Sequence, residues 1–148
     1  MKRILALLFS ALLCEIALAQ IPQPIKWTTE VLHTENNLFQ VRFTADIQSP
    51  WHFYDLGPYD GGPVPVSFSL TPSSTVTPVG EMRALSEPVR VFDDIFGMEV
   101  GYFENQAIFS QLVELNGKGG VLAGTVEWVA CNPETNECLP PTEYEFSV

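Results

Sequence analysis

Alternation of apolar and polar side chains, with a period of two residues, is the feature that most constrains the fold of this chain. From position 39 to position 47 every odd-numbered residue is apolar and every even-numbered residue is polar or charged. Only an extended strand places successive side chains on opposite faces, so this segment predicts a strand with one buried face and one face in water. Similar segments recur along the chain, separated by residues that favour turns, chiefly Pro, Gly and Asn.

This pattern predicts an all-β fold. The expected strands cover residues 25–32, 39–47, 51–54, 64–70, 75–79, 89–92, 100–103, 107–115, 126–131 and 144–148. We expect a hairpin turn at 35–37, an edge position for the strand that contains Pro65, and room for a helical turn only within 81–88. Short strands at such close spacing are typical of an immunoglobulin-like antiparallel β-sandwich, and the length suits one domain.

The start of the chain has the features of a secretory signal peptide. Lys2 and Arg3 give a positive start, residues 4–13 are mainly apolar, and Ala17-Leu18-Ala19 has the small-x-small pattern of a cleavage site. The apolar run is shorter than the roughly 20 residues that a membrane-spanning helix needs. We therefore predict a signal peptide at 1–19, a domain at 20–148, and a periplasmic or secreted location.

Removal of residues 1–19 would also remove Cys14 and leave two cysteines, Cys131 and Cys138. An even number of cysteines in an oxidising compartment implies one pair. The strand at 126–131 ends at a proline, polar residues follow, and Cys138 comes seven positions after Cys131, which is suitable geometry for a reversible disulfide. The alternative is a purely structural bond, which would stabilise the fold by roughly 2.5 kcal/mol through closure of an eight-residue loop.

Charge and motif content exclude several functional classes. The net charge is −11 and there is no basic patch, so neither nucleic acid nor an anionic membrane surface is an expected partner. His33 and His52 do not have the spacing of metal ligands, and no serine or glycine motif for catalysis or phosphate binding is present. We therefore expect no metal and no cofactor. Asp93 and Asp94, taken alone, indicate a solvated turn.

Three motifs together resemble a known family. They are the Trp51-His52-Phe53-Tyr54 stretch with its Gly-Gly-Pro loop, the Asp93–Gly97 segment followed by Tyr102-Phe103, and the Cys…Cys-Leu-Pro-Pro ending at 131–141. On these motifs residues 25–148 resemble the amino-terminal periplasmic domain of the transmembrane thiol–disulfide interchange protein DsbD. The six-residue gap between the cysteines is about one residue longer than in the best-known members.

The resemblance implies an immunoglobulin-like sandwich with Cys131 and Cys138 as a redox-active pair. It also implies that Asp93, Asp94, Ile95, Phe96 and Gly97 form a cap loop that shields the cysteines until a partner docks. Which of Ile95 and Phe96 lies over the disulfide remains open at this point.

The resemblance further implies a role as a thiol–disulfide oxidoreductase component. The expected partners are the thioredoxin-like domain of a membrane thiol–disulfide transporter and periplasmic disulfide client proteins. Because the sequence shows neither a transmembrane section nor a thioredoxin-like domain, we expect a stand-alone, monomeric domain whose partners are separate proteins.

A binding module is the rival interpretation. In that case a secreted β-sandwich recognises protein or sugar through the aromatic stretch from Trp51 to Tyr59, and its disulfide is inert. The two interpretations differ in the reactivity of the bond, since a structural disulfide resists exchange or the fold is lost with it.

Overall fold

The computed structural model describes residues 21–148, so the predicted signal peptide at 1–19 lies outside the described residues. Regular structure in the described part of the chain consists of strands, which confirms the all-β prediction. The strands are β1 (Ile25–Glu35), β2 (Leu38–Ile47), β3 (Phe53–Tyr54), β4 (Ser67–Leu70), β5 (Val76–Ala84), β6 (Val89–Asp93), β7 (Met98–Phe103), β8 (Gln106–Leu115), β9 (Ala123–Trp128), β10 (Cys131–Asn132), β11 (Glu137–Cys138) and β12 (Thr142–Ser147). Between residues 21 and 148, no helix is long and apolar enough to cross a membrane.

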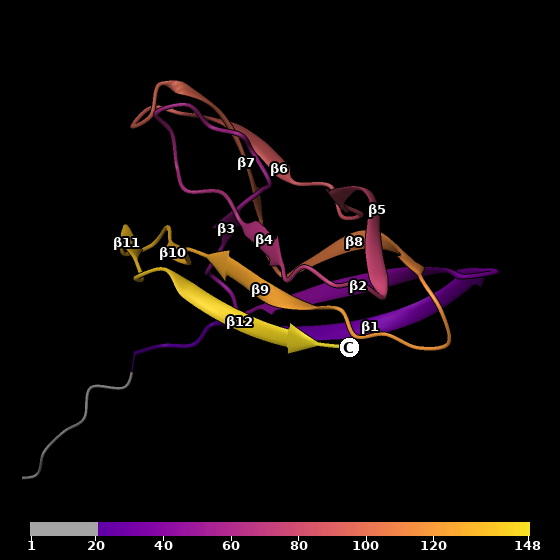
Figure 1. Cartoon of the computed structure of the whole chain (residues 1–148). Coiled ribbons are helices and arrows are strands. Elements are labelled where there is room, and N and C mark those ends of the chain that lie inside the picture. The colour runs from indigo at the N-terminus through magenta and orange to yellow at the C-terminus, as the bar shows by residue number, and fades with distance from the viewer. Residues whose placement is uncertain (1–20) are drawn as a thin grey trace, which may run out of the picture.

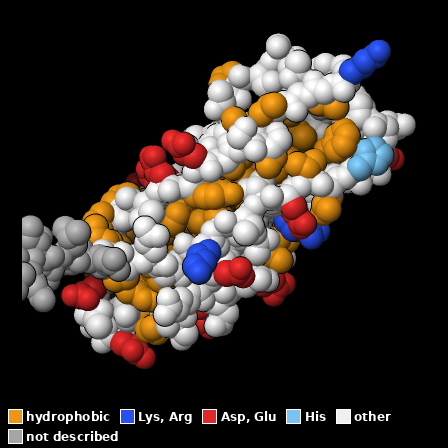
Figure 2. Space-filling view, turned by 90° about the horizontal axis from the view of Figure 1, so that it is seen from below, with side chains coloured by type: hydrophobic (Ala, Val, Ile, Leu, Met, Phe, Trp, Pro, Cys, Tyr) orange, Lys and Arg blue, Asp and Glu red, His pale blue; other side chains and the backbone are white. Residues whose placement is uncertain are grey.

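The strands form antiparallel sheets around a common core. One sheet has the order β1-β2-β8-β5 and packs against a second with the order β12-β9-β4. A third, β3-β7-β6, contains the long β6-β7 hairpin, which rises from the sandwich, and the small β10-β11 ladder lies at the same end (Figure 1). Seen from below, apolar side chains are visible in a band along the molecule, with charged side chains scattered on either side (Figure 2).

The alternation in the 39–47 segment is realised in β2. Val41, Phe43 and Ala45 are almost fully buried, while the intervening side chains face outward or are only partly covered. The preceding turn comes at Asn36-Asn37, as predicted, and Asn36 has a φ of 49°. Asparagine tolerates this left-handed conformation better than most residues, which explains its place in a tight hairpin.

Aromatic side chains join the two main sheets through Trp27 on β1. Its indole ring lies 5.9 Å from the ring of Phe109 in its own sheet, 6.0 Å from Phe68 and 5.5 Å from Trp128 in the facing sheet, measured between ring centroids. It also lies 5.7 Å from Phe53 on β3. One side chain therefore contacts all three large sheets, and the core is built without either cysteine.

Two strand predictions were wrong in their extent. β5 continues to Ala84, so no helical turn forms within 81–88. The strand is irregular in its middle, where its register with β8 shifts between Val79 and Arg83 and Gly80 has a positive φ. β4 begins only at Ser67, and Val64 is 52% exposed because it lies in the preceding loop. The edge position predicted for this strand is confirmed, since β4 pairs only with β9.

The predicted strand at 126–131 is divided in two. β9 ends at Trp128, where its pairing with Thr142 on β12 ends. Cys131 instead pairs with His52 and with Cys138, outside the sheet that holds β9. The chain thus changes partners between Trp128 and Cys131, and this change places the first cysteine beside the β3-β7-β6 sheet.

Candidate functional site

A disulfide joins Cys131 and Cys138 across the β10-β11 ladder. The two residues are directly opposite, with a Cα–Cα distance of 4.0 Å and an S–S bond of 2.06 Å. The loop between them folds as a tight turn: the Asn132 side-chain oxygen accepts a hydrogen bond from the Glu134 N–H at 2.9 Å, and Asn136 has a φ of 56°. The polar residues that suggested a loop in the sequence therefore hold the cysteines in register.

The two sulfur-bearing residues differ in exposure. Cys131 is only 6% exposed, whereas Cys138 is exposed to solvent. Exchange requires a thiolate to reach one sulfur along the line of the S–S bond. The outer residue, Cys138, is the one that solvent and an approaching protein can reach.

His52 lies opposite Cys131, on the side of Cys131 that faces away from Cys138. The His52 N–H donates to the Cys131 carbonyl at 3.0 Å, and the Cys131 N–H donates to the His52 carbonyl at 2.9 Å. Residues that exchange both hydrogen bonds are directly opposite and carry their side chains on the same face. His52, Cys131 and Cys138 therefore stand next to one another in three adjacent segments, with the exposed cysteine outermost.

A groove of about 300 Å³ borders this row. One wall comes from the cysteine ladder and the other from the β6-β7 hairpin. Its charged side chains are both acidic, Asp93 and Glu104. The remaining lining residues are Pro50, His52, Tyr54, Val91, Ile95, Val100, Tyr102, Cys131, Asn132, Pro133, Asn136 and Cys138.

The tip of the β6-β7 hairpin contains the predicted cap loop. Asp93 Oδ1 accepts hydrogen bonds from the N–H groups of Ile95 at 2.8 Å and Phe96 at 3.2 Å, and Gly97 takes a φ of 67° to close the turn. Ile95 lines the groove with both cysteines but is 87% exposed. Phe96 instead packs edge-on against the ring of Tyr54, with a centroid distance of 6.4 Å.

The structure thus brings part of the predicted site together. Asp93 and Ile95 border the same groove as Cys131 and Cys138. Asp94, Phe96 and Gly97 belong to the same turn but do not line the groove, and the turn leaves Cys138 uncovered.

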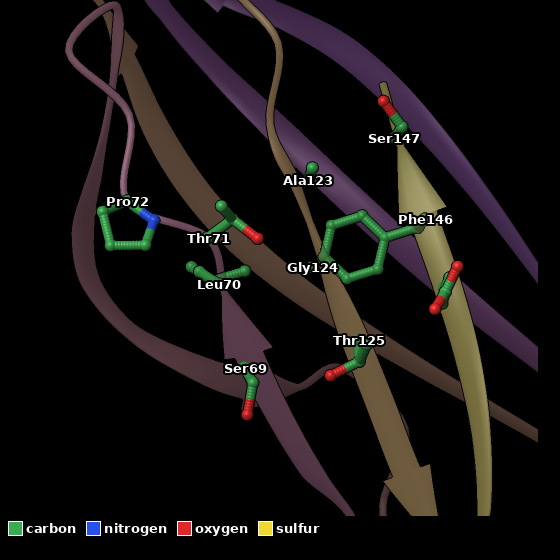
Figure 3. Close-up of a pocket in the computed structure, with 10 residues that line it drawn as sticks. Ser69, Leu70, Thr71, Pro72, Ala123, Gly124, Thr125, Phe146 and Ser147 are labelled. Atoms are coloured by element: carbon green, nitrogen blue, oxygen red, sulfur yellow. The ribbon is translucent and has the colours of Figure 1, made fainter.

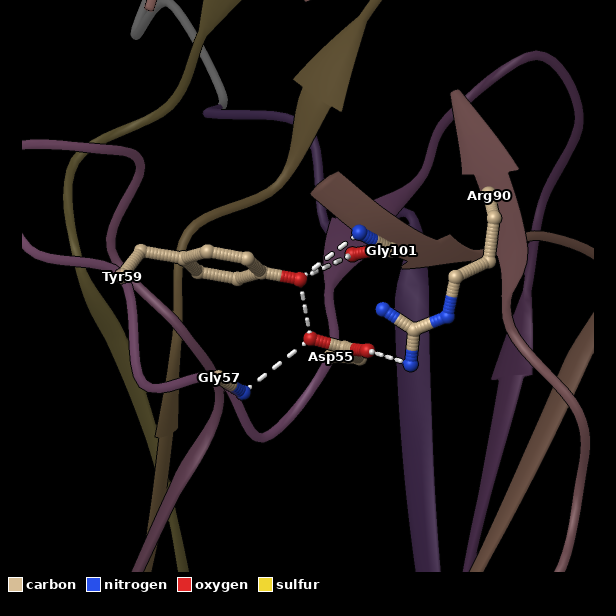
Figure 4. Close-up of polar contacts among 5 residues, drawn as sticks. All are labelled: Asp55, Gly57, Tyr59, Arg90 and Gly101. Carbon is tan, nitrogen blue, oxygen red and sulfur yellow. Dashed lines mark hydrogen bonds and ion pairs between the residues drawn. The ribbon is translucent and has the colours of Figure 1, made fainter. Parts of the chain in front are cut away.

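A polar network that sequence reasoning missed supports the base of this hairpin (Figure 4). The buried carboxylate of Asp55 accepts hydrogen bonds from the Tyr59 hydroxyl and from the Gly57 N–H, and its other oxygen lies 3.0 Å from an Arg90 nitrogen. The Tyr59 hydroxyl also accepts from the Gly101 N–H at 2.7 Å. An Asp two residues before Gly-Pro is a turn signal in the sequence, but nothing local points to Tyr59 and Arg90 as its partners.

Burial changes the proton affinity of two groove residues. It lowers the pKa of His52 below its usual value, while the carboxylates of Glu104 and Asp93 act in the opposite direction. Burial, with a smaller contribution from Asp93, raises the pKa of Tyr54. Both effects favour the uncharged form of the side chain near neutral pH.

A larger hollow of about 720 Å³ lies over strands β4, β9 and β12 (Figure 3). The Phe146 ring lies beside Gly124, where an added Cβ would come within 2.9 Å of the ring. The lining consists mainly of small and hydroxyl-bearing residues, with Glu145 as its one charged side chain. It brings together no sulfur and no acid–base pair, so the groove beside the disulfide is the candidate site.

Comparisons with solved structures place this fold among known domains. The chain is 17% identical to the reduced DsbD N-terminal domain of Neisseria meningitidis, with a TM-score of 0.53 and coverage of 82% of this chain and 83% of that one. It is 16% identical to the N-terminal periplasmic domain of ScsB from Proteus mirabilis, with a TM-score of 0.60 and coverage of 86% of this chain and 47% of that one.

A third similar structure is the complex between the DsbD N-terminal and PilB N-terminal domains of Neisseria meningitidis, at 16% identity and a TM-score of 0.52, with coverage of 82% and 80%. These likenesses confirm the immunoglobulin-like β-sandwich. No curated protein matches the chain in a sequence search. The family model described as "Thiol:disulfide interchange protein DsbD, N-terminal" matches residues 16–148. The chain therefore belongs to the family of DsbD N-terminal domains.

Proposed function

We propose that this protein is a periplasmic thiol–disulfide relay domain that passes electrons through the Cys131–Cys138 pair. The observation that carries the proposal is the asymmetric disulfide: one cysteine is exposed beside a groove, and the other is buried behind it. A partner's thiolate attacks the Cys138 sulfur, the S–S bond breaks, and Cys131 leaves as a thiolate. A second partner thiol then releases the reduced domain, which reduces a client disulfide by the reverse sequence.

The position of the bond supports exchange over a purely structural role. The disulfide closes a short loop outside the main apolar core, so its reduction leaves the packing of the large sheets in place. Loop closure of this length contributes only about 2.5 kcal/mol. The remaining core is large enough for a domain of this size to fold without a disulfide.

The aromatic stretch does not favour the rival binding module. Phe53 is fully buried, and Trp51 is half-buried against the core. The Tyr59 hydroxyl is engaged with Asp55 and Gly101. Most aromatic side chains of this stretch are therefore used inside the fold, and Tyr54 lines the groove beside the disulfide.

We propose a thioredoxin-like domain of a membrane thiol–disulfide transporter as the electron donor and periplasmic disulfide proteins as clients. Support comes from the family match and from the solved complex of a DsbD N-terminal domain with a domain of another protein. The same match supports a periplasmic location.

Reduction without unfolding is the test of this function. Incubation of the oxidised domain with reduced thioredoxin should yield two free thiols, counted by mass spectrometry after alkylation. The reduced domain should keep its far-ultraviolet circular dichroism, and its free energy of unfolding should fall by no more than about 2.5 kcal/mol. A double Cys131→Ala, Cys138→Ala variant is the matched control for stability. A disulfide that resists thioredoxin, or a fold that melts on reduction, would establish a structural bond instead.

Although Cys138 is exposed, we propose that Ile95 is the residue of the 93–97 turn that partly obstructs approach to the disulfide from the groove side. An Ile95→Ala change should increase the rate of reduction by dithiothreitol a few-fold, because its side chain borders the groove that leads to both sulfurs. Phe92→Ala is the matched control, since Phe92 is 66% exposed on the same hairpin and does not line the groove. Equal rates for Ile95→Ala and the unmodified domain would rule out this role.

A further inference from the structure

His52 occupies a position that the exchange reaction itself does not explain. Its backbone is hydrogen-bonded to that of Cys131, and its ring borders the same groove as both cysteines. The ring packs against Tyr102, with a centroid distance of 4.9 Å, and edge-on against Tyr54 at 5.6 Å. These contacts hold an imidazole beside the buried end of the disulfide.

The buried cysteine has a proton-transfer problem. As a thiol, Cys131 must lose its proton before it can attack, because the thiolate is the nucleophile. Cys131 is only 6% exposed, so a base from bulk water has little access to it. Among the residues that line the groove, the only neutral nitrogen base is His52; the other ionisable neighbours are the carboxylates Asp93 and Glu104 and the two tyrosines.

We infer that His52 is the base that accepts the proton of Cys131 when this thiol resolves a mixed disulfide on Cys138, and that it returns the proton in the reverse step. The inference rests on the proposed exchange function. His52 is suited to the role by geometry: Cys131 and His52 are a directly opposite pair, and Cys138 follows as the next residue in the same row.

The Cys131 S–H bond breaks and its proton passes to a ring nitrogen of neutral His52. The Cys131 thiolate attacks the Cys138 sulfur, an S–S bond forms between them, and the bond from Cys138 to the partner breaks. The partner's sulfur leaves with the electron pair, so the partner is reduced by two electrons as the domain becomes oxidised.

The groups around His52 determine its charge before the step. Asp93 at the end of β6 and Glu104 after β7 favour the protonated imidazole, whereas burial between Tyr54 and Tyr102 disfavours it. Burial is the larger effect and lowers the pKa of His52. The ring is therefore neutral, and able to accept a proton, at neutral pH, and it loses this ability as the pH falls below its pKa.

The reaction of the reduced domain with one equivalent of 5,5′-dithiobis(2-nitrobenzoate) isolates the step. Attack by Cys138 releases one thionitrobenzoate, and attack by Cys131 on the resulting mixed disulfide releases the second. The second phase is intramolecular, so its rate does not depend on reagent concentration. Thionitrobenzoate leaves without needing a proton, and the second phase therefore reports the deprotonation of Cys131.

Replacement of His52 by Gln should slow the second phase by roughly tenfold or more at pH 7, since a positioned base typically contributes about 100-fold or more. In the unmodified domain this rate should be nearly independent of pH between the pKa of His52 and the pKa of the Cys131 thiol. In the variant the rate should rise with pH in proportion to the fraction of Cys131 present as thiolate. The two rates should converge above the ordinary thiol pKa of about 8.5, where no base is required. A structural defect would instead lower the rate at every pH.

His33→Gln is the matched control, because His33 is exposed and its ring contacts the β1-β2 turn at the far end of the sandwich from the cysteine ladder (Figure 1). It should leave both phases unchanged. Two normal phases with an unaltered pH profile in His52→Gln would overturn the inference while leaving the exchange function intact. Absence of both phases in the unmodified domain would overturn the exchange function itself.

Discussion

A Cys131→Ser variant should form a stable mixed disulfide with a partner protein through Cys138. A Cys138→Ser variant should form at least roughly tenfold less mixed disulfide, through Cys131. Cys138 is exposed, whereas only 6% of Cys131 is accessible, so a protein-sized partner reaches the outer sulfur alone. Without Cys131 the mixed disulfide has no internal thiol to resolve it and therefore accumulates.

The experiment needs a partner with a single reactive cysteine. A thioredoxin whose second active-site cysteine is replaced, and whose first carries a thionitrobenzoate leaving group, meets this requirement. Non-reducing electrophoresis would give the yield, and mass spectrometry of the linked peptides would identify the sulfur. A variant with both cysteines replaced by Ser is the control for non-specific linkage. Equal yields from the two single variants would show that the sulfur assignment is wrong, and no product from either would favour the binding module.

Replacement of Trp27 by Ala should cost about 3–5 kcal/mol of unfolding free energy, as expected for a large aromatic residue removed from a core. For a domain of this size that loss corresponds to a fall in Tm of roughly 10–20 °C. The reason is that the indole is 8% exposed and contacts aromatic side chains in all three large sheets. Urea denaturation followed by circular dichroism measures the change directly.

Trp27→Phe is the matched variant for this prediction. It keeps an aromatic ring and removes the indole N–H, which has no hydrogen-bond partner within residues 21–148. The loss of unfolding free energy in Trp27→Phe should therefore be clearly smaller than the loss in Trp27→Ala. A loss below about 1 kcal/mol for Trp27→Ala would contradict the central place of this ring in the core.

Strands could be predicted from the sequence where local alternation decided the outcome. The 39–47 segment is such a case, because the burial of Val41 and Phe43 follows from the period of a single strand. The break between β9 and β10 could not be predicted, since apolar residues continue through Ala130 and nothing local marks the change of partner. β9 ends at its last pair, Trp128 with Thr142, and Cys131 then pairs with His52, which is distant in the sequence.

The same distinction applies to the candidate site. The two cysteines and the 93–97 turn were identified by residue type and by resemblance to a family, and the structure places Asp93 and Ile95 beside the cysteines. In the sequence, His52 belongs to a family motif and is unsuited by spacing to bind a metal, but nothing there points to a place beside the cysteines. Its position opposite Cys131 depends on a bridge between distant segments, which residue spacing cannot reveal.

The Asp55 network has a mechanical consequence for the β6-β7 hairpin. Arg90 and Gly101 are directly opposite in its ladder and are both held by the segment that follows β3, one through Asp55 and the other through Tyr59. The tip at Ile95 lies several residues further out, where Met98 lies against Gly62 and Phe96 packs on Tyr54, while the Ile95 side chain itself is 87% exposed. We therefore expect the hairpin to be held more firmly at Arg90 and Gly101 than at Ile95. A protein that presses on the tip should therefore displace Ile95 more than Arg90, and the width of the groove should change most at the end nearest Ile95.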